Sequence, residues 1–146
     1  MDINVIDLKI EKIRKITIDN DTDYVYGVET SQNIFCKDIG SLNIENAAIL
    51  CLDSTNKIIN YSRVAMGEIN HVKVQISQIA KIALLSNASK VIIAHNHPSG
   101  VLEITSNDIE LTQKIGYFLK LIDIELIDSL VVNEVQAKSV REEVGK

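Results

Sequence analysis

The sequence predicts a single domain of the α/β class, in which helices and strands alternate along the chain around a common core. Its 146 residues are enough for one domain that buries roughly two-thirds of its unfolded surface. Apolar residues make up 46% of the chain and charged residues 24%, values that exclude the disordered and fibrous classes. A helical pattern at residues 76–85 leads into an apolar strand at residues 90–94, which is the alternation typical of α/β folds.

The first third of the chain predicts an extension, a short helix and a β-hairpin. Residues 1–22 alternate Ile with charged residues at no clean period, so we expect an N-terminal extension over 1–23 that packs on a domain spanning 24–146. Apolar residues after a Ser cap predict a helix over 31–39, closed by Gly40. The apolar runs 47–52 and 58–64 flank Asp53-Ser54-Thr55-Asn56, and such a turn-forming segment between two runs predicts a hairpin.

The remaining elements follow from periodicity. Residues 76–85 place their apolar side chains on one helical face, and the Val-Ile-Ile-rich run 90–94 predicts a strand buried on both faces. Residues 106–121 predict a second amphipathic helix with Thr105 or Ser106 as its N-cap. We expect a last strand over 124–132 and a charged tail over 133–146.

Three metal-ligating side chains lie close together where the central strand ends. His95 and His97 are two residues apart, so both imidazoles can face one side of a strand end. Pro98 and Gly100 then turn the chain, which lets Asp108 in the next helix supply a carboxylate. Two His and one Asp leave one tetrahedral position of Zn²⁺ open, which is the catalytic pattern, because a structural zinc takes four protein ligands.

The two cysteines do not complete a closed zinc site. Cys51 lies in an apolar strand and Cys36 in the first predicted helix, so neither is placed to be a fourth ligand. An apolar strand also gives Cys51 no means of lowering its pKa, which argues against a Cys51–His95 nucleophilic pair. With no secretory signal and no apolar run of 18 residues, we expect a cytoplasmic protein in a reducing compartment, outside the membrane.

The most specific feature of the sequence is a motif within residues 95–112. It consists of His95-Asn96-His97-Pro98-Ser99-Gly100, followed by Thr105, Asp108, Ile109, Glu110, Leu111 and Thr112. This motif resembles the JAMM core of the RadC-like proteins, a family of the JAB/MPN class. Upstream, Glu45 followed by Leu50, Leu52, Asp53 and Asn56 is similar to the Glu-led strand and turn of that family, so the resemblance covers roughly residues 31–132.

The resemblance implies a fold, a metal and a reaction. It implies a three-layer α/β/α sandwich of the cytidine-deaminase-like kind with a mixed sheet, and a zinc ion held by His95, His97 and Asp108. It implies that Glu45 is the general acid and base in the hydrolysis of an amide bond in a peptide, isopeptide or protein substrate. The family's Ser that stabilises the reacting carbonyl falls on Thr105 here, with Ser106 adjacent.

Each feature also has a less specific interpretation. The polar loop could be coincidental, with Asp108 acting only as a first-turn charge of a helix. Glu45 could be a solvated residue before a strand, in which case Glu68 or Glu103 would replace it. His71 is interpreted as a surface residue, and Asn96 and Ser99 as residues that shape the loop.

Two other function classes stay open at this point. RadC-like proteins are associated with DNA repair and mobile elements, which suggests a binding module. The net charge of −5 and the scattered basic residues disfavour direct binding to nucleic acid. The other alternative is a catalytically silent scaffold, although such relatives lose metal ligands and this chain retains all three.

Overall fold

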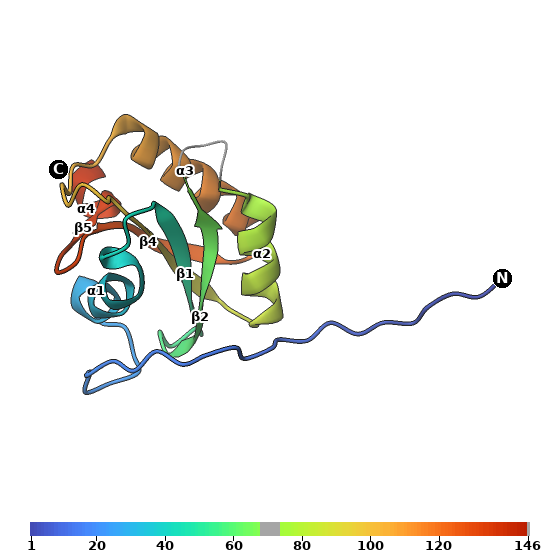
Figure 1. The fold of residues 1–146 in the computed structure, drawn as a ribbon. Helices are drawn as coiled ribbons and strands as arrows, with labels where there is room; N and C mark the ends of the chain where they lie inside the picture. Colours follow the sequence, from blue (N-terminus) through green and yellow to red (C-terminus); the bar gives the residue numbers. More distant parts are fainter. Residues whose placement is uncertain (68–73, 146) are drawn as a thin grey trace.

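The computed structural model describes residues 1–67 and 74–145, and it is built from five strands and five helical segments in that part of the chain. The sheet lies in the middle, with α1 on one side and α2 on the other (Figure 1). The segments in chain order are α1 (Val28–Phe35), η1 (Cys36–Gly40), β1 (Asn46–Leu52), β2 (Ile58–Met66), α2 (Ile76–Leu85), β3 (Lys90–Asn96), α3 (Ser106–Leu121), β4 (Glu125–Val132), β5 (Ala137–Ser139) and α4 (Val140–Val144).

The sheet is mixed, with strand order β2-β1-β3-β4-β5. β3 is central and pairs antiparallel with β1 and parallel with β4. The predicted hairpin is confirmed, since β1 and β2 pair antiparallel. In its turn, the Asp53 carboxylate accepts hydrogen bonds from the backbone N–H groups of Thr55 and Lys57, which is how Asp stabilises such turns.

Both faces of the sheet are covered, and the inner strand β1 is accordingly apolar at every position after Asn46. Ala48, Leu50 and Leu52 of β1 face α1 and η1, whereas Ala47, Ile49 and Cys51 face α2 and α3. Alternate side chains of a strand point to opposite faces, so one continuous apolar run supplies both cores. The predicted three-layer α/β/α architecture is confirmed, and α2 has the predicted bounds.

The first helix differs from the prediction in its bounds and its type. It begins at Val28 rather than Ser31, and its end continues as a π-helical turn, η1. At that end a Cβ on Gly40 would lie 2.2 Å from the Asn133 carbonyl oxygen. Gly40 therefore permits the close approach of η1 to the segment after β4, in addition to closing the helix.

The predicted charged tail over 133–146 is wrong, because this region folds back as β5 and α4. β5 pairs antiparallel with the end of β4. The buried Asp128 carboxylate accepts hydrogen bonds from the Ser139 hydroxyl at 2.6 Å and the Arg141 backbone N–H at 3.3 Å. The three residues of β5 are too few to show a period of two, so the element depends on its partners in β4.

Residues 1–23, named the arm here, form no helix or strand. Arg14 forms an ion pair with Asp38 at 2.7 Å, and Lys37 donates a hydrogen bond to the Thr17 carbonyl. The arm is thus fixed to η1 by its second half. Within residues 1–67 and 74–145, no helix has the length and apolar character needed to cross a bilayer.

Candidate metal centre

The carboxyl end of β3 carries the two histidines. In the sheet register His95 lies beside Ala47 of β1 and Val131 of β4. His97 follows the strand, and its backbone N–H still bonds to the Val132 carbonyl at 3.0 Å. The sheet therefore fixes the backbone of both histidines before the loop to α3 begins.

Asp108 joins them from the first turn of α3. One carboxylate oxygen lies 2.9 Å from His95 Nε2, and the other lies 3.8 Å from His97 Nε2. Ligand atoms from the three residues all lie within 4.8 Å of one another. Ligands of a tetrahedral zinc are roughly 3.3 Å apart, so the structure brings the three residues together at a spacing suited to one ion.

The loop after β3 orients His97. His97 Nδ1 lies 2.9 Å from the Val101 carbonyl oxygen, to which it can donate a hydrogen bond. That bond fixes the tautomer that leaves the Nε2 lone pair available to a metal. Gly100 adopts a φ of +82°, which lets the chain turn back so that Val101 reaches the ring.

A capping box holds Asp108. Its carboxylate accepts a hydrogen bond from the Thr105 backbone N–H at 2.8 Å, and the Thr105 hydroxyl accepts one from the Asp108 N–H at 3.2 Å. Burial alone would raise the pKa of Asp108, but the adjacent His95 ring and the Thr105 N–H lower it to about 2. The side chain is therefore ionised at neutral pH, as a metal ligand must be.

The His95 ring provides the test of whether this cluster suits a metal. His95 Nε2 is buried and has no hydrogen-bond partner among the described residues, although Asp108 Oδ1 is only 2.9 Å away. A cation between these atoms would satisfy both, so the donor set fits a metal ion.

Glu45 immediately precedes β1 and is half-buried. Since Ala47 pairs with His95, continuing the antiparallel register by two residues puts Glu45 across from His97. The Glu45 carbonyl accepts a hydrogen bond from Gly67 N–H at the end of β2, which holds this segment from its other side. The sheet register thus places Glu45 at the same edge as the histidines.

Asn96, between the two histidines, has a structural role that the sequence analysis described only as shaping the loop. Its side chain is fully buried, and it bonds to backbone groups of residues 42, 44 and 46. The sequence held one signal for this role. Side chains alternate between the two faces of a strand, so a residue between two site histidines must point away from the site.

The other candidate residues lie as follows. Thr105 is the N-cap of α3, as predicted, and Ser106 and Glu103 are exposed nearby. Glu68 and His71 fall outside the described residues. Burial raises the pKa of the Cys51 thiol to about 11, which supports its exclusion as a nucleophile.

A three-layer α/β/α sandwich whose mixed sheet ends in a His-His-Asp cluster is consistent with the JAB/MPN class of proteins. Comparison with known protein families identifies the family to which the chain belongs. The profile of the RadC-like JAB domain matches residues 25–145, and the chain belongs to this family.

Curated relatives carry the name UPF0758. The UPF0758 protein of Finegoldia magna is 36% identical over 108 residues, which are 74% of this chain and 48% of that protein. The relative from Pseudoalteromonas translucida is 35% identical over 122 residues, which are 84% of this chain and 52% of that protein. The chain spans about half the length of these relatives, and their name states no activity, metal or substrate.

Proposed function

We propose that the chain is a zinc-dependent hydrolase of the JAMM type that cleaves an amide bond. The observation that carries the proposal is the convergence of His95, His97 and Asp108 around the unsatisfied His95 Nε2. Three protein ligands from nitrogen and oxygen donors are the set that catalytic zinc uses, because the fourth position stays open.

Each residue of the cluster has a defined task in this proposal. His95, His97 and Asp108 would hold the ion. When bound, zinc lowers the pKa of a water molecule toward about 7 and polarises the substrate carbonyl. Glu45 would take the proton from the attacking water and return it to the leaving amine. The Thr105 hydroxyl accepts a bond from Asp108 N–H, and its own proton stays available to stabilise a developing oxyanion.

The substrate class in this proposal is a peptide or protein with an exposed amide or isopeptide bond. The net charge of −5 disfavours phosphate-rich partners, so the proposal includes no direct contact with nucleic acid. The two cysteines are both free and buried, which supports a reducing, cytoplasmic setting.

Metal content is the test of the proposal. The chain, purified without a metal-affinity tag, is analysed for elements beside His95→Ala, His97→Ala and Asp108→Ala. We expect near one zinc per native chain and a loss of zinc in each variant. A native chain that stays empty after zinc is added would contradict the hydrolase proposal and leave a binding module as the better account.

Glu45→Gln separates metal binding from chemistry. The amide is close to the carboxylate in size but takes up no proton, so we expect zinc content to match the native chain while hydrolysis is lost. Glu103→Gln is the matched control, because Glu103 is exposed in the loop before α3 and should keep activity. Full activity of Glu45→Gln on a cleaved substrate would show that Glu45 is not the general base.

A further inference from the structure

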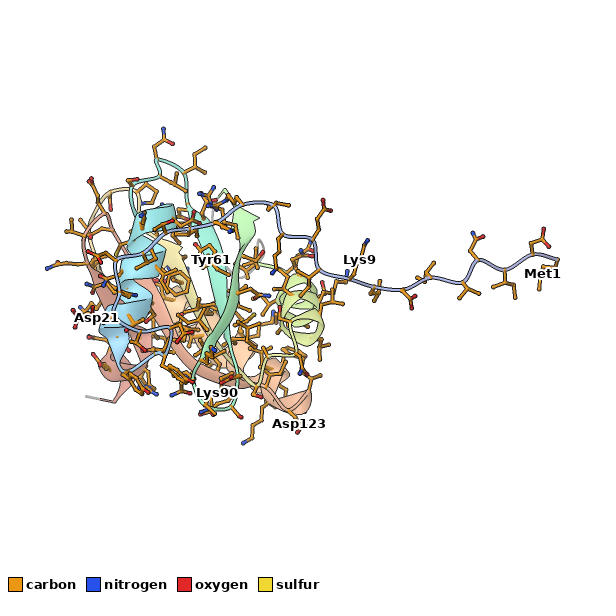
Figure 2. The ribbon with its side chains drawn as sticks, turned by 90° about the horizontal axis from the view of Figure 1, so that it is seen from below. Met1, Lys9, Asp21, Tyr61, Lys90 and Asp123 are labelled. Atoms are coloured by element: carbon orange, nitrogen blue, oxygen red, sulfur yellow. The ribbon has the colours of Figure 1, made fainter. Side chains whose placement is uncertain are left out.

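The first part of the arm exposes an unusual number of large aliphatic side chains. Six of them, between 46% and 97% exposed, lie within the first 13 residues; they are Ile3, Val5, Ile6, Leu8, Ile10 and Ile13. Figure 2 shows the chain running from Lys9 out to Met1, away from the domain. Side chains of this kind forgo the stabilisation that burial gives, and such a cluster marks a contact surface.

Residues 6–10 of this segment have the pattern of a strand, although residues 1–22 as a whole follow no single period. Ile6, Leu8 and Ile10 alternate with Asp7 and Lys9, a period of two. Residues 1–23 contain neither Gly nor Pro, the residues that most readily reverse a chain tightly. The first eight residues, named the tip here, are therefore suited to pair with a sheet edge rather than to fold back on their own arm.

The edge strand β2 offers such a place. The Asp23 carbonyl accepts a hydrogen bond from Ile58 N–H, and an isolated antiparallel bridge joins Tyr24 to Lys57. Beyond these contacts, no backbone bond joins the arm to residues 59–66 in the described part of the chain. Natural proteins cover such an edge, and an added strand is one way to do so.

A groove of about 1420 Å³ lies between residues 9–24, most of them in the arm, and the surface formed by β2 and the end of α2. Its walls include Ile59 and Tyr61 of β2 and Ile82 and Leu85 of α2. Figure 2 shows the arm crossing the domain near Tyr61 on its way to Asp21. Because the groove lies along residues 9–24, which form no helix and no extended run of strand, its shape suits a short extended segment of polypeptide.

Charge is complementary between the tip and this groove. The groove is lined by five basic and three acidic side chains: Lys9, Lys12, Arg14, Lys15 and Arg63, with Glu11, Asp21 and Asp23. The tip carries Asp2 and Asp7 and no Lys or Arg. An incoming tip therefore meets a groove of opposite net charge, which favours this pairing over like-charged alternatives.

We propose that the tip of one copy of this chain inserts as an added strand into the arm groove of a second copy, beside β2. The tip and the groove belong to the same chain, so a twofold exchange covers both tips and both β2 edges at once. The proposal is independent of the metal centre, since it concerns the arm and the strand edge at β2.

Sedimentation equilibrium of the full chain over a wide concentration range tests the exchange. We expect a mass of twice 16.2 kDa for the native chain. The double variant Ile6→Asp, Leu8→Asp should weaken the dimer by roughly tenfold or more, because it places charge where apolar side chains are buried. Both positions lie outside every element, so the fold should stay intact, which circular dichroism checks.

Leu121→Asp is the matched control, because it makes the same change at an exposed leucine on α3. It should leave the dimer unchanged. A native chain that is monomeric at every concentration, or a dimer that the tip variant does not weaken, would overturn the proposal.

Cross-linking distinguishes exchange from contact within one chain. Two variants, one with Leu8→Cys and the other with Ile59→Cys, are mixed and oxidised. The native Cys36 and Cys51 are buried, so they should not form the new disulfide. We expect a disulfide-linked species of twice the chain mass in the mixture. A chain carrying both cysteines that links only to itself, with no product in the mixture, would overturn the exchange.

Discussion

The Asn96 side-chain oxygen accepts a hydrogen bond from the Asn46 backbone N–H at 2.5 Å, between residues fifty positions apart. The Asn96 amide nitrogen donates to the Leu42 and Ile44 carbonyls, each at 3.1 Å. One side chain on the central strand therefore holds the backbone on both sides of Glu45. The residue between the two histidines links the candidate general base to the strand that carries the candidate metal ligands.

Asn96→Ala should destabilise the fold, because it removes the partner of the buried Asn46 N–H and of the Leu42 carbonyl. The Ile44 carbonyl loses one of its two hydrogen bonds and keeps the one from the Asn46 side chain. We expect the free energy of unfolding to fall by ~2–3 kcal/mol, measured by urea denaturation. Ser99→Ala is the control, since Ser99 is exposed in the loop that follows β3 and should change stability by less than about 0.5 kcal/mol. Equal stability of the Asn96 variant and the native chain would show that these bonds are replaced by water.

Thr105→Val should weaken the start of α3 and loosen Asp108. The variant keeps the shape of Thr105 but loses the hydroxyl that accepts from Asp108 N–H, at a cost of ~0.5–2 kcal/mol. Zinc affinity should fall by roughly tenfold to a hundredfold, as for other groups that orient a ligand. Thr105→Ser retains the hydroxyl, so its stability in urea denaturation and its zinc affinity in a competition titration should match those of the native chain. If Thr105→Ser is as impaired as Thr105→Val, the methyl group of Thr105, and not its hydroxyl, is responsible.

Under the proposed function, removal of zinc by a chelator should lower the melting temperature of the native chain. Zinc at a thousand times its Kd stabilises a folded protein by ~4 kcal/mol if it does not bind the unfolded chain. A calorimetric scan with and without a chelator measures the shift. His97→Ala is the control: its ring is only partly buried, so the variant should fold, and its melting temperature should not respond to the chelator.

Ionised Asp38 should contribute to the free energy of unfolding, and this contribution should be lost at acid pH. Burial would raise the pKa of Asp38, but hydrogen bonds from Arg63, Tyr61 and Arg14 outweigh it and hold the pKa below its ordinary value of 3.8. Because the folded pKa is lower than the unfolded one, the stabilisation is present above about pH 4 and is lost as pH falls through the folded pKa.

Asp38→Asn should therefore lower the free energy of unfolding by ~1.5–3 kcal/mol at neutral pH. We expect the lower end of this range, because Arg14 and Arg63 are partly exposed and solvent weakens their ion pairs with Asp38. The difference between the native chain and the variant should shrink as pH falls below about 4. Urea denaturation at a series of pH values measures it. A difference that is the same at neutral pH and at about pH 3 would mean that ionisation of Asp38 contributes nothing.

Much of the fold could be predicted because local patterns encode it. Apolar residues that recur with the helical period of 3.6 predicted α2 at residues 76–85. The turn-forming residues 53–56 between two apolar runs predicted the hairpin of β1 and β2. The sequence also identified the end of β3 as the place where polar side chains gather. These features depend on neighbours in the chain, so periodicity and turn chemistry reveal them.

β5 and α4 could not be predicted in this way. Ala137-Lys138-Ser139 has no strand pattern, and its place in the sheet depends on the end of β4 and on Asp128, eleven residues before Ser139. The Val101 carbonyl that orients His97 was missed for a similar reason. A backbone carbonyl carries no signal in a sequence until the loop conformation is known.

The sequence by itself determined the class of fold, the order of most elements and the set of His95, His97 and Asp108, because residue type and spacing along the chain are sufficient for these. Only the tertiary structure decided that His95 Nε2 lacks a hydrogen-bond partner among the described residues, that Asn96 holds the segment around Glu45, and that the tip of the arm extends exposed, away from the domain. These facts depend on which distant groups meet in space, and that is set by the packing of the sheet and its helices.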